Sequence, residues 1–199
     1  ARKYNINKDY FKVWSHNMAY VFGFWCADGC IYGGRLFDIT IHKKDKYLIK
    51  KIAEELEYEG PLYDYVDHQA SRLNFSCKEI YNDIINLGGM ENKSNILEFP
   101  DIPNEYLSDF IRGYFDGDGC IMNLKGGRIN SAFTSGSQKF LEKLHQLLKK
   151  NAGVVGGSYD ASSQSLRFGK KDTYKIGEYI YKNDPELFLL RKKQKFYNF

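Results

Sequence analysis

Two short stretches of the sequence each place an aspartate beside glycine, directly after an apolar segment of helical character. They are FWCADGCI (residues 24–31) and YFDGDGCI (residues 114–121), in which Asp28 and Asp118 occupy matching positions. The C-terminal end of a helix carries partial negative charge, and an acid there is disfavoured by about 0.3–1 kcal/mol. Helix stability therefore does not explain these two acids, and their repetition indicates a shared chemical role.

The two stretches belong to an internal repeat. Gly23, Ala27 and Asp28 align with Gly113, Gly117 and Asp118, 90 residues later, and the next three residues are identical. A longer turn then shifts the alignment. Beyond it, Phe37, Ile39 and Ile41 align with Ile129, Ser131 and Phe133, and Leu73 and Phe75 align with Leu166 and Phe168. The sequence therefore predicts two similar halves, residues 1–97 and 98–199, in one compact unit.

Each half follows the order helix, two strands, helix, two strands, helix. In the first half we expect helices at residues 17–27, 45–56 and 78–87, where apolar residues recur with a helical period. The segments 30–42, 60–66 and 71–77 read as strands. The connector ILEFPDIPNEY carries two prolines and no helical period. The expected fold is α+β, with two pseudo-symmetric αββαββα repeats.

Glycines inside the first helix of each half need an explanation. Gly23 and Gly113 each cost about 1 kcal/mol relative to alanine in a helix. With Ala27 and Gly117 four residues later, each helix carries a stripe of small residues, which lets two helix backbones approach to or below the usual 8–10 Å. Parallel packing of the stripes brings the two aspartates together. The alternative is that each glycine only accommodates a bulky neighbour within its own half.

Two carboxylates held this close repel one another. One of them must take up a proton, or the fold loses several kcal/mol. A divalent cation removes the conflict, and Mg²⁺ prefers a few hard oxygen ligands with room for water and phosphate oxygens. Metal ions that contact the attacking and leaving oxygens suit phosphodiester hydrolysis. The competing interpretation is structural, with both acids capping nearby backbone amides.

The stretches VFGFWCADG and IRGYFDGDG resemble the two signature motifs of the LAGLIDADG homing endonucleases, in the single-chain form with two motifs. The resemblance covers nearly the whole chain. It implies parallel motif helices at a pseudo-twofold axis, two saddle-shaped antiparallel sheets on double-stranded DNA, and metal-dependent cleavage of both strands across the minor groove. We therefore expect a monomeric, site-specific DNA endonuclease with a long asymmetric target.

The resemblance also implies roles for residues of the motifs. The family's metal-binding acid is the last acid of each motif, so the expected metal site comprises Asp28, Asp118, Ala27 and Gly117. Mg²⁺ or Mn²⁺ is expected to support cleavage, whereas Ca²⁺ is expected to bind without supporting it. The earlier motif acid corresponds to Cys26 and Asp116. Because the two halves differ there, we interpret Asp116 as a peripheral helix residue.

Phosphodiester hydrolysis also needs positive charge near the phosphate. The stretch MENKSNILEFP offers Lys93, and LLRKKQKF offers Lys192 or Lys193 at the matching place. In the family a basic residue at this position lines each active site, so we expect Lys93 and Lys192 to act with the two aspartates. Ordinary solvated lysines are the alternative.

Strand alternation predicts which polar residues face away from the helices. If Phe37, Ile39 and Ile41 pack inward, the residues between them face outward. A polar two-stranded ribbon fits the DNA major groove, where Arg reads guanine and Asn reads adenine, although solvated strand faces look similar. The predicted DNA contacts are Arg35, Asp38, Thr40, His42, Lys43, Arg72, Asn74, Ser76, Arg128, Asn130, Thr134, Ser165 and Arg167. Arg35 and Lys43, with Lys44 and Lys46, are expected to touch phosphate.

The overall composition is compatible with these expectations. A net charge of +4 and a pI near 8.7 permit nucleic-acid binding. No apolar run approaches the roughly 20 residues that span a bilayer, and the N-terminus has no signal-peptide pattern. We therefore expect an intracellular protein of the cytoplasm or nucleoid with no membrane partner. The four cysteines lack metal-ligand spacing and are expected to be reduced.

Two other functions fit the same fold. One is an RNA maturase that binds its own intron RNA, and the other is a non-catalytic DNA-binding regulator. Retention of both motif acids weighs against the regulator, because a binding surface gains nothing from two crowded carboxylates. A nuclease embedded in an intein is less expected, since no flanking splicing segments are visible.

Overall fold

The computed structural model describes residues 4–65, 67–124 and 128–197. The first half contains α1 (His16–Asp28), β1 (Gly29–Tyr32), β2 (Leu36–His42), α2 (Lys46–Glu55), β3 (Tyr63–Tyr65), β4 (Ala70–Ser76) and α3 (Lys78–Asn86), with the 3₁₀ turns η1 (Tyr10–Lys12), η2 (Lys43–Asp45) and η3 (Lys93–Asn95). The second half contains α4 (Leu107–Asp118), β5 (Gly119–Leu124), β6 (Arg128–Thr134), α5 (Gln138–Ala152), β7 (Ser158–Asp160), β8 (Ser165–Phe168), α6 (Lys170–Ile180) and α7 (Leu190–Tyr197). The predicted order of elements is confirmed, and Val66, expected to end the third strand, lies outside the described residues.

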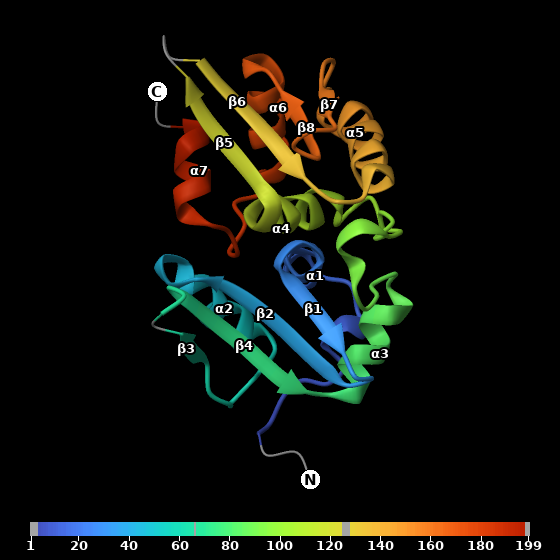
Figure 1. Cartoon of the computed structure of the whole chain (residues 1–199), viewed down its shortest axis with the longest axis vertical. Helices are drawn as coiled ribbons and strands as arrows, with labels where there is room; N and C mark the ends of the chain where they lie inside the picture. Colours follow the sequence, from blue (N-terminus) through green and yellow to red (C-terminus); the bar gives the residue numbers. More distant parts are fainter. Residues whose placement is uncertain (1–3, 66, 125–127, 198–199) are drawn as a thin grey trace.

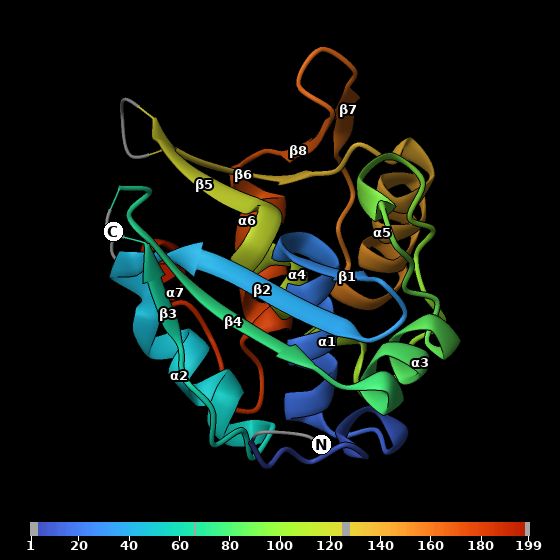
Figure 2. The same cartoon turned by 60° about the horizontal axis from the view of Figure 1, so that its bottom comes forward.

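Two four-stranded antiparallel sheets form the molecule, one in each half. Their strand orders are β1-β2-β4-β3 and β5-β6-β8-β7. Figures 1 and 2 show α1 and α4 side by side between the two sheets. This arrangement confirms the α+β class with two pseudo-symmetric repeats. The predicted division between residues 97 and 98 falls in the segment between η3 and α4.

The inward faces of the sheets follow from strand alternation. Phe37, Ile39 and Ile41 of β2 are buried, as predicted, and Leu73 and Phe75 of β4 are buried opposite them. The neighbouring residues of β4 lie on the other face, since successive side chains of a strand point to opposite sides. Each sheet thus covers the helices with its apolar face and leaves a polar face outside.

The first motif helix, α1, is placed by both of its ends. Ser15 caps the N-terminus, where its Oγ accepts a hydrogen bond from the Met18 amide at 3.0 Å. At the other end Gly29 adopts an extended conformation, so that the chain passes directly from Asp28 into β1. The second motif helix ends in the same way, with Asp118 followed by extended Gly119. Both acids are therefore the last residues of their helices.

The two motif helices touch through their backbones. A Cβ atom added to Gly23 would lie 2.0 Å from the Phe110 carbonyl oxygen, and one added to Gly113 would lie 2.0 Å from the Tyr20 carbonyl oxygen. No side chain fits at either position, because real Cβ contacts are not found at such distances. The predicted small-residue interface is confirmed. The alternative, that each glycine serves only its own half, is wrong.

One part of the predicted repeat alignment is wrong. Gly29 pairs with Ile39 in the first sheet, and Gly119 pairs with Phe133 in the second. Ile39 therefore corresponds to Phe133 and not to Ser131. The second hairpin is longer, with β5 extending to Leu124, so the shift between the halves is larger than expected. Because the error is two residues, it leaves every side chain on its predicted face.

Within the described residues, no helix combines the length and the apolar composition needed to cross a membrane.

Candidate active site

The motif acids meet at one end of the α1–α4 interface. A Cβ added to Gly117 would lie 2.3 Å from the Ala27 Cβ and 3.2 Å from the Asp28 Oδ2, so the Asp28 carboxylate lies against the last turn of α4. Burial, and secondly the charge of Asp118, raises the pKa of Asp28 to about 6, although this side chain keeps access to solvent. Burial also raises the pKa of Asp118. The two carboxylates therefore share one site, as the repeat predicted.

A buried lysine accompanies each helix end. Lys93 is 7% exposed, and its Nζ donates to the Ala27 carbonyl at 3.4 Å. Lys192 is 5% exposed, and its Nζ donates to the Gly117 carbonyl at 3.1 Å and to the Asp116 and Gly119 carbonyls at 2.6 Å. These cations satisfy carbonyls at the negative ends of the helices. The alternative of ordinary solvated lysines is wrong for both.

Burial also sets the titration of these lysines. It lowers the pKa of Lys93, and it lowers the pKa of Lys192 to about 8. Lys193 occupies a different environment, 4.2 Å from the centre of the Phe188 ring and 3.7 Å from an Asp184 oxygen. Of the two lysines left open by the sequence, the structure therefore places Lys192 at the helix end.

A cavity of about 270 Å³ brings residues of both halves together. Lys93 of the first half lines it with Asp118 and Tyr114 of the second. The Tyr114 hydroxyl donates to the Thr134 carbonyl at 2.8 Å, and burial, followed by the Asp118 charge, raises its pKa. Sequence reasoning missed Tyr114, because one tyrosine among many in an apolar helix gives no distinguishing signal.

Asp116 is a buried residue of the helix interface, so its interpretation as peripheral was wrong. It is 1% exposed, and its Oδ2 accepts from the Tyr20 hydroxyl at 2.8 Å and from the Leu189 amide at 2.7 Å. Tyr20 lies on α1, whereas Leu189 directly precedes α7. Burial raises the pKa of Asp116, and the charge of Lys192 opposes this rise most strongly. Asp116 thus ties α4 to α1 and to the C-terminal segment.

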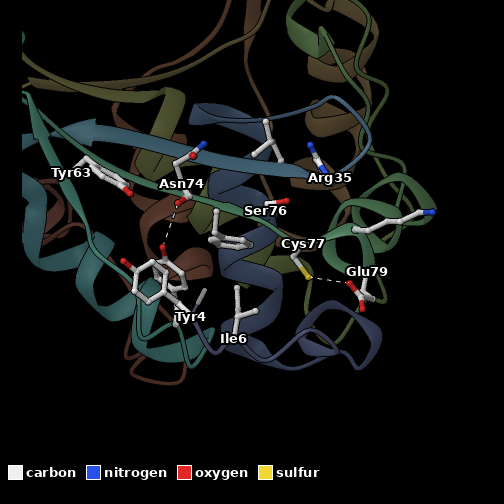
Figure 3. Close-up of a pocket in the computed structure, with 12 residues that line it drawn as sticks. Tyr4, Ile6, Arg35, Tyr63, Asn74, Ser76, Cys77 and Glu79 are labelled. Atoms are coloured by element: carbon white, nitrogen blue, oxygen red, sulfur yellow. Dashed lines mark hydrogen bonds between the residues drawn. The ribbon is translucent and has the colours of Figure 1, made fainter. Parts of the chain in front are cut away.

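Most of the predicted DNA contacts lie on the outer faces of the sheets. The exposed ones are Arg35, Thr40, His42, Lys43, Ser76, Thr134 and Arg167, and the half-buried ones are Arg72, Asn74 and Asn130. The Arg128 side chain lies outside the described part of the chain. Arg35, Asn74, Ser76 and Tyr63 line a cavity of about 680 Å³ in the first half. Figure 3 shows Asn74 toward the Tyr63 end of this cavity and Arg35 toward the opposite end. Their contact with DNA stays a prediction.

Two of the predicted DNA contacts are buried. Asp38 is 4% exposed, because Arg72 forms an ion pair with it and Asn74 donates to its Oδ2 at 2.7 Å. Ser165 is also 4% exposed, and its Oγ accepts from the Arg167 Nε at 3.1 Å. Both were expected to face outward as DNA contacts. In each case a longer neighbour on the same face covers the shorter side chain, so the arginine reaches solvent in its place.

The helix ends fit a hard divalent cation. Within residues 4–65, 67–124 and 128–197, no group of three or more His, Cys, Asp and Glu side chains could hold a metal ion. The side-chain donors are the two carboxylates, and the Ala27 and Gly117 carbonyls accept hydrogen bonds from Lys93 and Lys192, so their role as metal ligands stays a prediction. Mg²⁺ keeps several of its waters and needs only one or two protein carboxylates. Asp28, which lies against Gly117, and Asp118 are two such carboxylates, and their binding of Mg²⁺ stays a prediction.

Comparison with known protein sequences places the second half in a family. Residues 105–182 match the model of the LAGLIDADG-like domain. A segment of 64 residues is 45% identical to part of a probable translation initiation factor IF-2 from Thermococcus kodakarensis. That segment is 32% of this chain and only 5% of the other protein, so the chain spans a small part of that relative.

Comparison with solved structures concerns the whole chain. The homing endonuclease I-WcaI bound to its DNA recognition sequence matches with a TM-score of 0.62 and 18% identity, over 95% of this chain and 91% of that one. The LAGLIDADG homing endonuclease I-LtrWI bound to target DNA matches with a TM-score of 0.58 and 14% identity, over 96% and 89%. At these identities the likeness concerns the fold. The motif resemblance is thus confirmed in the second half, where residues 105–182 match the LAGLIDADG-like domain, and the whole chain has the two-repeat fold of single-chain LAGLIDADG homing endonucleases.

Proposed function

We propose that the protein is a site-specific endonuclease that hydrolyses both strands of double-stranded DNA and requires Mg²⁺. The observation that carries this proposal is the meeting of Asp28 and Asp118 at the ends of two touching helices, with a buried lysine beside each helix end. A fold alone does not define an activity, so the proposal rests on these side chains. A regulator would gain nothing from this crowding of charge.

The residues of the site divide the work of phosphodiester hydrolysis. Asp28 and Asp118 would hold Mg²⁺, which supplies charge neutralisation on the phosphate and a more acidic bound water. Lys93 and Lys192 are held in place by helix carbonyls and would stabilise the negative charge that develops on the phosphate. Their burial strengthens this effect, because water screens a buried charge less.

Double-stranded DNA fits as the substrate. The homing endonucleases I-LtrWI and I-WcaI, whose structures share this fold, are bound to DNA in those structures. In this chain, exposed Arg167 lies on the outer face of the second sheet, and exposed Arg35 and Lys43 flank β2 at its two ends. The two faces carry different residues, which favours a non-palindromic target. One chain supplies both motif acids, so we propose that it acts as a monomer.

The test is cleavage of a randomised duplex library with Mg²⁺, read by sequencing of the cut ends. We expect cutting at one long asymmetric site and no cutting in EDTA. On that target, Asp28→Asn and Asp118→Asn should abolish double-strand cutting and leave DNA affinity within about threefold. The matched control is Asp9→Asn, since Asp9 is an exposed acid that pairs with Lys12 and is not among the charges that shift the pKa of Asp28 or Asp118. Undiminished cutting by both motif variants, or the absence of cutting by the parent protein, would reject the proposal.

A further inference from the structure

The surroundings of Asp28 and Asp118 differ in one charged pair. Asp45 directly precedes α2, and at the same place before α5 stands Ser137, whose Oγ accepts from the Phe140 amide at 3.3 Å. Arg191 directly precedes Lys192, whereas Asn92 directly precedes Lys93. The pseudo-symmetric positions thus hold an acid and a base near Asp28 and two neutral residues near Asp118.

Asp45 and Arg191 form an ion pair across the two halves. The Arg191 Nε lies 3.1 Å from Oδ1 and 2.9 Å from Oδ2 of Asp45, and Nη2 lies 2.8 Å from Oδ2. The Asp45 side chain is 4% exposed, whereas the Arg191 side chain is 52% exposed. One edge of the guanidinium is therefore anchored on a buried carboxylate, while much of the side chain stays accessible.

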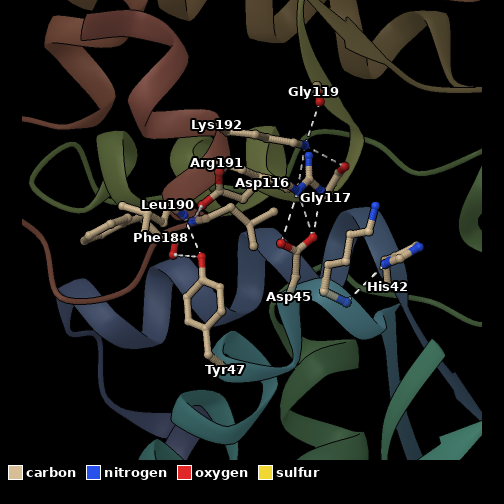
Figure 4. Close-up of polar contacts among 12 residues, drawn as sticks. His42, Asp45, Tyr47, Asp116, Gly117, Gly119, Phe188, Leu190, Arg191 and Lys192 are labelled. Atoms are coloured by element: carbon tan, nitrogen blue, oxygen red, sulfur yellow. Dashed lines mark hydrogen bonds and ion pairs between the residues drawn. The ribbon is translucent and has the colours of Figure 1, made fainter. Parts of the chain in front are cut away.

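The start of α7 is held against α2 by a second contact. The Tyr47 hydroxyl accepts from the Leu190 amide at 2.6 Å and donates to the Phe188 carbonyl at 3.2 Å. Figure 4 shows Tyr47 and Asp45 reaching this segment from α2 and its preceding turn, with Lys192 directed toward Gly119. Arg191 and Lys192 are consequently placed by the same rigid segment.

Pseudo-symmetry places Arg191 at the Asp28 centre. The cavity of about 270 Å³ joins Lys93 to Asp118 and to Gly136, which lies just before α5, so the matching Lys192 and Arg191 lie with Asp28 and the segment before α2. Burial is the largest cause of the raised pKa of Asp28, and the charges of Lys192, Lys93 and Arg191 oppose it. For Asp118 the opposing charges are those of Lys93 and Lys192. Arg191 is thus an additional cation close to Asp28.

In the second half, the place that corresponds to the Asp45–Arg191 pair is filled by backbone atoms and by the side-chain amide of Asn95. A Cβ added to Gly136 would lie 2.2 Å from the Asn95 Oδ1 and 2.5 Å from the Ser94 carbonyl oxygen, so η3 packs directly on Gly136. Asn92 itself adopts a left-handed backbone conformation with φ of 53°. The described residues provide no second arginine at this end of α4.

We propose that Arg191 is a catalytic residue of the Asp28 centre, where its free edge binds a non-bridging oxygen of the scissile phosphate, and that buried Asp45 is its positioning residue. This inference rests on the proposed nuclease function. Arginine suits the role because its planar fork binds phosphate oxygens in pairs and keeps its proton throughout. The Asp118 centre has no such group, so the two strands of the target are cut at unequal rates.

The experiment measures cutting of each strand separately. A duplex carrying the target selected from the library is labelled at a different end on each strand, and both rates are followed with Mg²⁺. We expect Arg191→Met to slow one strand by about tenfold and the other by less than about threefold, with nicked duplex accumulating. Arg191→Lys should recover only part of the rate, because it keeps the charge and loses the fork.

Further variants separate positioning from folding. Asp45→Asn should slow the same strand as Arg191→Met, and the double variant should be no slower than Arg191→Met alone. The double variant also removes the unpaired buried charge that a single change leaves, so it reports on strand rates if Arg191→Met folds poorly. Lys12→Met is the matched control, since it removes one exposed ion pair and one positive charge that does not act on Asp28 or Asp118.

The outcomes distinguish this inference from the proposed function. If the parent protein cuts both strands and Arg191→Met slows them equally or not at all, the inference is overturned while the nuclease function stands. If Asp45→Asn slows the opposite strand, the positioning role is overturned. If the parent protein cuts no target, the nuclease function and the inference fail together.

Discussion

The contact between α1 and α4 predicts a large cost for the smallest possible side chain at its centre. In Gly113→Ala the new Cβ would lie 2.0 Å from the Tyr20 carbonyl oxygen and 2.8 Å from the Phe24 amide nitrogen. Both neighbours are backbone atoms of a helix, which cannot rotate away as a side chain can. The helices must therefore separate until the contact reaches about 3.4 Å, where ordinary van der Waals distances begin.

The expected loss follows from two opposing effects. Alanine stabilises a helix by about 1 kcal/mol relative to glycine. Overpacking typically costs about 1–3 kcal/mol, and a gap of 0.5–1 Å already removes a quarter to a half of each contact energy along the interface. Because the separation acts on the whole helix pair, we take the upper end of this cost and expect a net loss of about 2 kcal/mol after the helix gain. For a chain of this size that loss lowers the Tm by about 4–8 °C.

The assay is thermal unfolding followed by circular dichroism, with urea unfolding to check the free energy. Gly23→Ala should behave like Gly113→Ala, since its Cβ would meet the Phe110 carbonyl oxygen at the same distance. Gly169→Ala is the control, because no atom lies within 4 Å of its Cβ position and its φ is −77°. A Gly113→Ala protein that melts as high as the Gly169→Ala control would refute close backbone contact between the helices.

Three further predictions concern titration, the buried acid and DNA reading. The pKa of Asp28 near 6 in the fold exceeds its ordinary value of 3.8, so the free energy of unfolding falls as the pH rises through this interval. In EDTA, Asp28→Asn should therefore gain about 1 kcal/mol of stability at pH 8, after allowance for solvent screening, and nothing at pH 4. Equal gains in Tm at both pH values would contradict this. Tyr20→Phe should lose about 1–3 kcal/mol in urea unfolding, because it removes a donor from buried Asp116; an unchanged midpoint would show that the bond contributes little. Arg72→Ala should cost about 1–3 kcal/mol of DNA-binding free energy at one or two base pairs, whereas Lys43→Ala should weaken binding to all sequences and reduce the salt dependence of binding by about one ion. Binding to single-base target variants at two salt concentrations separates these patterns, and a uniform loss for Arg72→Ala would make Arg72 a phosphate contact.

The sequence by itself determined the repeat, the order of elements and the meeting of the two acids. Helical and strand periodicities are local properties, so the extent of α1 to within one residue at each end, the end of β2 and the inward face of β2 could be predicted from neighbouring residues. The glycines of the motif helices carried tertiary information as well. An interior glycine has a known cost, and its repetition at the same spacing in both halves required close helix packing to explain it.

Only the tertiary structure decided which polar groups neutralise one another. Asp116 is buried because Tyr20 and the Leu189 amide reach it from distant segments, and Asp38 is covered because Arg72 lies across from it in the sheet. The choice of Lys192 over Lys193 depended on the rotation of α7 about its own axis, and the ion pair of Asp45 with Arg191 depended on the distance between α7 and α2. These contacts join residues far apart in the chain, and no local period encodes the relative placement of the elements that carry them.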